Sequence, residues 1–131
     1  IIGLGSSGVH ANGFSLVRKA LSKRELAQYR RRLLAPTRIY VKPVLKAIET
    51  VPIHSIAHIT GGGLTRRILS LTAGHKGLRT RIIQNSWPVP AIFRSIQAAG
   101  TIKIDEMFNT FNMGIGMAIR PALRDGKYLL Y

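Results

Sequence analysis

Three glycine-rich segments most constrain the fold of this chain, because each adjoins an apolar run. They lie at residues 3–8 (GLGSSG), 61–63 (GGG) and 114–116 (GIG). The apolar runs predict strands over residues 51–59 and 111–119, and residues 1–13 are predicted as the end of a strand that runs into a glycine loop. A glycine on a strand face indicates that another group approaches the backbone closely there.

Between the glycine segments, apolar residues recur with helical spacing. Helices are predicted from residue 14, from residue 22, and over 37–50, 64–71 and 91–99. Pro43 predicts that the third helix kinks or begins near Lys42. Residues 78–83 are a candidate for a further strand, and the tail over 121–131 is predicted as a turn with an apolar end. Helices and strands without strict alternation favour the α+β class.

The charge of the chain limits what it can bind. Among 131 residues, 20 Lys and Arg face five Asp and Glu, a formal net charge of +15 at pH 7. A hydrophobic fraction of 46 % excludes a disordered polycation. A folded domain with this charge is typical of proteins that bind nucleic acid or another polyanion.

The composition also disfavours several other kinds of site. The absence of Cys excludes disulfides, a thiol nucleophile and a Cys-based zinc site. Four isolated His without neighbouring carboxylates disfavour a catalytic metal, so no metal ligands are predicted. No apolar run approaches ~20 residues, so we expect no membrane span and an intracellular protein.

The first glycine segment has the spacing G-x-G-x-x-G. A dinucleotide site also needs an acidic residue about 20 positions later, and Glu25, near that spacing, lies in a basic helical run. The loop could instead present backbone N–H groups and the hydroxyls of Ser6 and Ser7 to a phosphate. A tight turn that requires glycine for its geometry is the open alternative.

Five blocks make the sequence resemble a known family. SSGVHANGFSLVRKAL, LLAPTRIYVKPVL, AHITGGGL, SWPVPAIF and EMFNTFNMGIGM occur in this order between residues 6 and 117. They resemble the C-terminal domain of aminoimidazole ribonucleotide synthetase, the phosphoribosylformylglycinamidine cyclo-ligase of purine biosynthesis (the PurM-like family). The resemblance implies an α+β fold in α/β/α layers, with a mixed sheet and flanking helices. It also implies homodimerisation and ATP-dependent ring closure to aminoimidazole ribonucleotide in the parent enzyme.

The resemblance further implies a groove that holds phosphate and nucleotide. Its lining in this chain would comprise Ser6, Ser7, Gly8, His10, Asn12, His58, Thr60, Gly61, Gly62, Gly63, Asn112 and Gly114. Without the resemblance, His10 and His58 would be interpreted as structural histidines.

The chain also departs from the family pattern. The family's N-terminal ATP-binding domain, with its DGVGTK-type nucleotide and metal motif, has no counterpart in residues 1–131. We therefore expect one domain over 1–131 with truncated ends. Arg66 and Arg67 stand where the family usually has an acid and an amide, and a basic run, SKRELAQYRRR, replaces a longer insertion.

These departures favour a non-catalytic, RNA-binding structural subunit of a ribonucleoprotein as the first hypothesis. Its assembly would be a ribosome, in a mitochondrion or another organelle, with rRNA and neighbouring proteins as partners. The predicted phosphate contacts are Arg18, Lys19, Lys23, Arg24, Arg30, Arg31, Arg32, Arg66, Arg67, Arg79 and Arg81. Tyr29 and Tyr40 are the candidates for base stacking, and each cation could instead be a solvated surface residue.

The alternative hypothesis is the C-terminal half of a functional cyclo-ligase in the cytoplasm, working with a separate N-terminal half or a homodimer mate. ATP and Mg²⁺ would be cofactors only in that case, and none is expected otherwise. A module that binds a phosphate or nucleotide without turnover is a third possibility.

Overall fold

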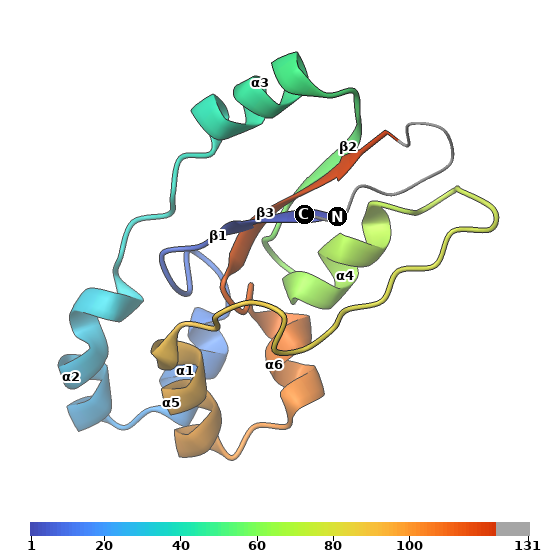
Figure 1. Ribbon diagram of the computed structural model, residues 1–131. Helices are drawn as coiled ribbons and strands as arrows, with labels where there is room; N and C mark the ends of the chain where they lie inside the picture. The colour runs from blue at the N-terminus through green and yellow to red at the C-terminus, as the bar shows by residue number, and fades with distance from the viewer. Residues whose placement is uncertain (123–131) are drawn as a thin grey trace.

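The computed structural model describes residues 1–122, in which three strands and six helices alternate irregularly (Figure 1). The elements are β1 (Ile2–Gly5), α1 (Phe14–Ala20), α2 (Lys23–Leu33), α3 (Val41–Thr50), β2 (Ile53–His58), α4 (Gly63–Ser70), α5 (Ala91–Gly100), α6 (Ile104–Thr110) and β3 (Ile115–Pro121). The predicted α+β class is confirmed. The tail prediction falls, from residue 123 onward, outside the described residues.

The sheet has the strand order β1-β3-β2, and β3 pairs antiparallel with both neighbours. Ala118 in the middle of β3 lies opposite Gly3 of β1 and Ala57 of β2. This differs from the mixed sheet that the resemblance implies. Strands β1 and β2 run in the same direction but are not neighbours, because β3 lies between them. Since β3 runs the opposite way, both pairings of the sheet are antiparallel.

The helices cover the two faces of the sheet unevenly. Helices α1, α4, α5 and α6 surround one hydrophobic core, in which the rings of Phe93 and Phe111 lie 5.8 Å apart. Val17 of α1 and Met107 of α6 are fully buried in the same core. Helix α3 lies on the far side of the sheet from α4 and has no buried residue. The α/β/α arrangement is therefore dominated by one helical layer.

The strand predicted over residues 78–83 does not form. The segment nevertheless alternates as a strand does, because Leu78, Thr80 and Ile82 are half-buried and the residues between them are exposed. Ile82 packs against the core, and the Thr80 hydroxyl is bonded to Thr72 Oγ1 at 2.9 Å. The segment thus lies extended over the helical layer, where no strand edge offers it backbone partners.

Candidate phosphate-binding site

All three glycine segments meet at one edge of the sheet. Because β1 and β2 run in the same direction, they end at the same edge, at Gly5 and His58. Strand β3 runs the opposite way and begins at this edge, at Ile115, directly after Asn112 and Gly114. Residues that are up to about 100 positions apart in the sequence are therefore brought together, as the resemblance implies.

The buried side chain of Asn112 holds the first glycine loop in place. Its Oδ1 accepts hydrogen bonds from Ser6 Oγ and from the N–H of Gly114, both at 2.9 Å. Its Nδ2 donates to the carbonyl oxygens of Gly8 at 2.7 Å and Val9 at 3.3 Å. A buried amide that uses both of its ends in this way fixes the path of the loop.

This brace divides the predicted groove residues into two roles. Ser6 and Asn112 are buried and bonded to each other, so they position the loop. Ser7 Oγ donates to the carbonyl of Pro36 at 2.6 Å, which ties the loop to the segment after α2. The hydrogen bonds found among the described residues use no main-chain N–H of residues 8–11 as a donor. These N–H groups are the ones that could bind an anion.

His10 is buried within the loop, in a left-handed conformation with φ of 58°. Its Nε2 accepts the N–H of Ser7 at 3.2 Å, which assigns the proton of the neutral ring to Nδ1. Nδ1 is buried and has no hydrogen-bond partner among the described residues. Burial lowers the pKa of His10, and the nearby His58 and Arg38 lower it further. His10 is therefore a neutral donor at pH 7.

Tyr40 is a site residue whose role the sequence did not indicate. Its hydroxyl donates to the carbonyl of Gly5 at 2.9 Å, and its ring lies 6.2 Å from His10 and 6.3 Å from His58. Gly116 leaves the space for it, since a Cβ there would overlap the Tyr40 hydroxyl. Burial raises the pKa of Tyr40.

Of the two tyrosines predicted to stack on bases, Tyr40 is unavailable for stacking. Tyr40 is 7 % exposed, and Tyr29 packs against the hydrophobic core. The prediction is therefore wrong for Tyr40, whereas Tyr29 is only half-buried and its stacking stays a prediction. Tyr40 belongs to the LLAPTRIY block of the resemblance, and this block was the sequence feature that could have suggested a place for Tyr40 near the first glycine loop.

The second glycine segment lies on the other side of the same edge. His58 is exposed at the end of β2, and the N–H of Gly63 donates to Thr60 O at 3.1 Å as α4 begins. Gly61 is exposed, and a Cβ added there would meet nothing within 4 Å, whereas Gly63 is packed against α6. Only the exposed part of this segment is open to a ligand.

The basic residues do not form one surface. Arg18 and Lys19 on α1 are exposed, as are all five cations of α2. Arg66, Arg79 and Arg81 lie on α4 and the segment after it, on the opposite side of the domain in Figure 1. Arg67 is half-buried, and its Nε donates to the carbonyl of Gly61 at 3.1 Å. The predicted RNA contacts are thus split into separate groups.

Two further site classes are absent from residues 1–122. These residues contain no group of three or more His, Asp or Glu side chains that could hold a metal ion. They also contain no helix long and apolar enough to cross a membrane.

An α+β domain whose glycine loops converge at one sheet edge, with unpaired N–H groups in a braced loop, has the features of a phosphate-binding domain. Residues 1–127 match the family model "AIR synthase related protein, C-terminal domain", and the chain belongs to this family. The resemblance carried by the five blocks is confirmed.

Several curated relatives share the name phosphoribosylformylglycinamidine cyclo-ligase. The chain is 50 % identical to the protein of Caldicellulosiruptor bescii, over 91 % of this chain and 38 % of the relative. Identity is 45 % to the Bacillus pumilus protein (91 % of this chain, 37 % of the relative) and 44 % to that of Burkholderia ambifaria (95 % and 37 %). The chain thus spans well under half the length of these relatives. None of them supports a ribosomal subunit or an organellar location.

Proposed function

We propose that this chain forms the C-terminal part of a phosphoribosylformylglycinamidine cyclo-ligase and supplies one side of its substrate groove. The observation that carries the proposal is the convergence of both glycine loops and Asn112 at one sheet edge, in a chain half identical to a protein of that name. This proposal corresponds to the alternative hypothesis from the sequence. We prefer it to the first hypothesis, a structural subunit of a ribonucleoprotein.

In this proposal the first loop binds phosphate oxygens of the substrate. The N–H groups of residues 8–11 act as donors, and the bonds of Asn112 to Gly8 and Val9 keep them oriented. A loop that is already ordered loses little conformational entropy on binding, which favours affinity. The neutral His10 adds a donor that is buried beside the same loop.

In this proposal ATP and Mg²⁺ are bound by residues outside the described part of this chain. The described residues do not fit a Mg²⁺ site, because hard cations need several oxygen ligands and no acidic cluster exists in this part of the chain. No metal-dependent step is therefore assigned to these residues. The remainder of a cyclo-ligase, as a separate N-terminal half or in a homodimer mate, would supply nucleotide binding.

A chimera tests the proposal. The matching segment of the Caldicellulosiruptor bescii protein is replaced by this chain, and ATP-dependent formation of aminoimidazole ribonucleotide is measured. We expect ring closure by the chimera. Asn112→Ala should raise the KM for the phosphorylated substrate at least tenfold, since the braced loop loses its orientation. Asn109→Ala is the matched control, because Asn109 is exposed on α6.

Two results would contradict the proposal. One is a folded chimera, with native helix content by circular dichroism, that shows no ring closure above the level without ATP. The other is an equal KM for the Asn112→Ala and Asn109→Ala chimeras, which would remove the loop from substrate binding.

A further inference from the structure

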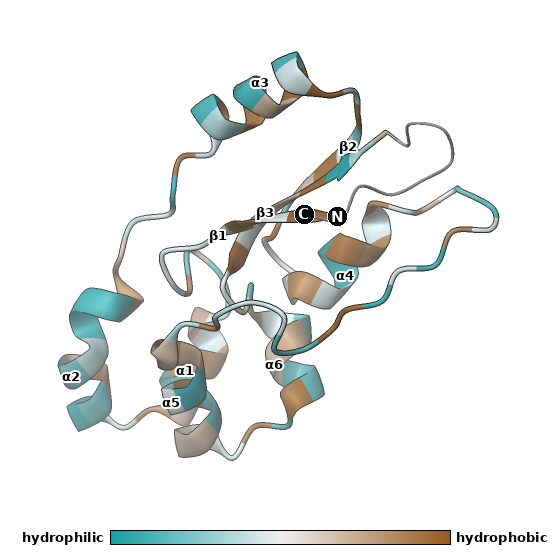
Figure 2. Cartoon of the chain, viewed as in Figure 1, coloured by the Kyte–Doolittle hydropathy of each residue, from teal (hydrophilic) through white to brown (hydrophobic). Residues whose placement is uncertain are grey.

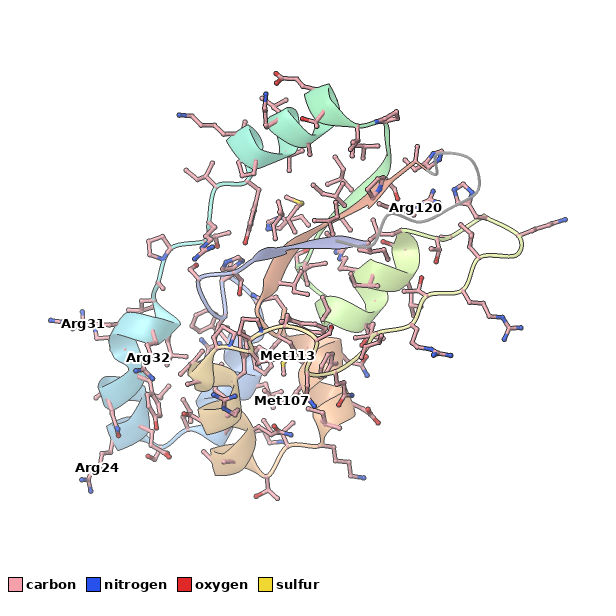
Figure 3. All side chains as sticks on the ribbon, viewed as in Figure 1. Arg24, Arg31, Arg32, Met107, Met113 and Arg120 are labelled. Carbon is pink, nitrogen blue, oxygen red and sulfur yellow. The ribbon has the colours of Figure 1, made fainter. Side chains whose placement is uncertain are left out.

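Helix α2 carries its cations on the side that faces solvent. Over eleven residues it has five, all exposed: Lys23, Arg24, Arg30, Arg31 and Arg32. Leu26, Tyr29 and Leu33 turn the opposite side toward the core. Figure 2 shows α2 as hydrophilic along most of its length, and Figure 3 shows Arg24 and Arg31 pointing away from the domain.

No carboxylate neutralises this face within the described residues. The only ion pair found there joins Lys46 and Glu49 on α3, at 3.6 Å. Glu25, the one acid of α2, is engaged in a capping box, accepting from Ser22 N–H at 2.8 Å and from Ser22 Oγ at 2.6 Å. The cations therefore repel one another unless an external anion screens them.

The folding of α2 explains only part of this charge. Cations in the last turn, at residues 30–32, interact favourably with the helix dipole. Lys23 and Arg24 lie in the first turn, where the dipole disfavours positive charge. Helix stability therefore does not account for basic residues at both ends of one exposed face.

The spacing of the cations fits an extended anion. Arg24 and Arg31 are seven residues apart, two helical turns or about 10.5 Å along the same face. Arg31 and Arg32 also line an open groove of about 670 Å³ that continues to Pro36. One phosphate group cannot reach both ends of this surface, whereas a chain of phosphates can contact several cations at once.

We propose that the exposed face of α2, with the groove beside it, binds the phosphate backbone of a nucleic acid strand. Contact is with the backbone, because the one aromatic residue of α2, Tyr29, packs against the core. A lipid surface fits less well. The outward side of the helix has no large apolar residue to insert, and the exposed Leu34 lies beyond its end.

Fluorescence anisotropy with a labelled 20-nucleotide RNA tests this surface in the full chain. The test variant is Arg24→Gln/Arg31→Gln/Arg32→Gln. The matched control, Arg66→Gln/Arg79→Gln/Arg81→Gln, removes the same charge from exposed positions on the other side of the domain. Circular dichroism verifies that both variants keep the parent's helix content.

Each single-strand phosphate contact contributes about 0.7 to the slope of log affinity against log salt. Loss of three contacts should lower the slope of the α2 variant by about 2. Between 50 and 200 mM salt, the parent's affinity should then fall more than tenfold further than that of the variant. The control should keep the parent's slope, and DNA of equal length should bind as RNA does.

Several outcomes overturn the proposal. Equal weakening by both variants would show that net charge alone acts, with no site on α2. Binding that is flat across this salt range would exclude phosphate contacts. A chain that binds phosphatidylserine vesicles and neither nucleic acid would assign the face to a lipid surface.

Discussion

Replacement of Gly63 by alanine should strongly destabilise the domain. Gly63 begins α4 with φ of 64°, in the left-handed region that residues with a Cβ seldom adopt. A Cβ at this position would overlap the backbone of Phe108 and Asn109 in α6. Both obstacles are main-chain atoms, so no side-chain rotation can relieve the contact.

The magnitude follows from two costs and one gain. Left-handed strain costs about 1–3 kcal/mol, and overpacking against α6 costs about 1–3 kcal/mol. Alanine recovers about 0.4–1 kcal/mol by restricting the unfolded chain. The net loss is about 1–5.6 kcal/mol, compared with the ~5–15 kcal/mol that stabilises a typical domain.

Urea denaturation followed by circular dichroism measures this loss. Gly61→Ala, two residues earlier, is the control, because it has no positive φ and nothing within 4 Å of the added Cβ. It should stay within about 0.5 kcal/mol of the parent. A Gly63→Ala variant as stable as Gly61→Ala would refute the packing argument. In the chimera, a loss of ring closure in Gly61→Ala at unchanged stability would indicate ligand contact at Gly61.

Four further predictions concern stability. Asn112→Ala leaves buried groups of the first loop unpaired and should cost about 2–4 kcal/mol in urea denaturation; a loss below 1 kcal/mol would show that the loop holds itself. Ser22→Ala should cost about 1 kcal/mol and lower the helical signal of α2. Because hydrogen bonds from Ser22 lower the pKa of Glu25, the cap should weaken as pH falls below about 4.5. The folded-state pKa of His10 lies below its ordinary value of 6.5, so its contribution is present above pH 6.5 and is lost as pH falls through the lowered pKa. The urea midpoint should therefore drop between pH 7.5 and 5.5 in the parent and drop less in His10→Asn; parallel profiles would exclude His10 as the cause.

Local patterns in the sequence were sufficient to predict most elements. Pro43 placed the start of α3 within one residue, since a proline lacks the N–H that the first helical turn does not use. The helical spacing from residue 22 and the apolar run of residues 51–59 act over short distances in the same way. The strand predicted at residues 78–83 failed because alternation reports which side is buried, and a strand also needs a neighbouring edge.

The site shows the same division between local and distant causes. The glycine segments and the five blocks identified the family and predicted the residues of a groove. They could not distinguish a glycine needed for packing, such as Gly63, from an open one, such as Gly61, because the atoms that decide belong to α6. The sequence likewise could not show that the Tyr40 hydroxyl bonds to the carbonyl of Gly5, because the two residues are 35 positions apart.

By itself, the sequence determined the α+β class, the family, the basic character of the chain and the positions of its loops. Each of these depends on residue type and short-range spacing. Only the tertiary structure decided that the glycine segments share one sheet edge, that Asn112 braces the first loop, and that the arginines form separate groups. Those features depend on the antiparallel insertion of β3 between β1 and β2, which brings distant residues into contact that no local pattern records.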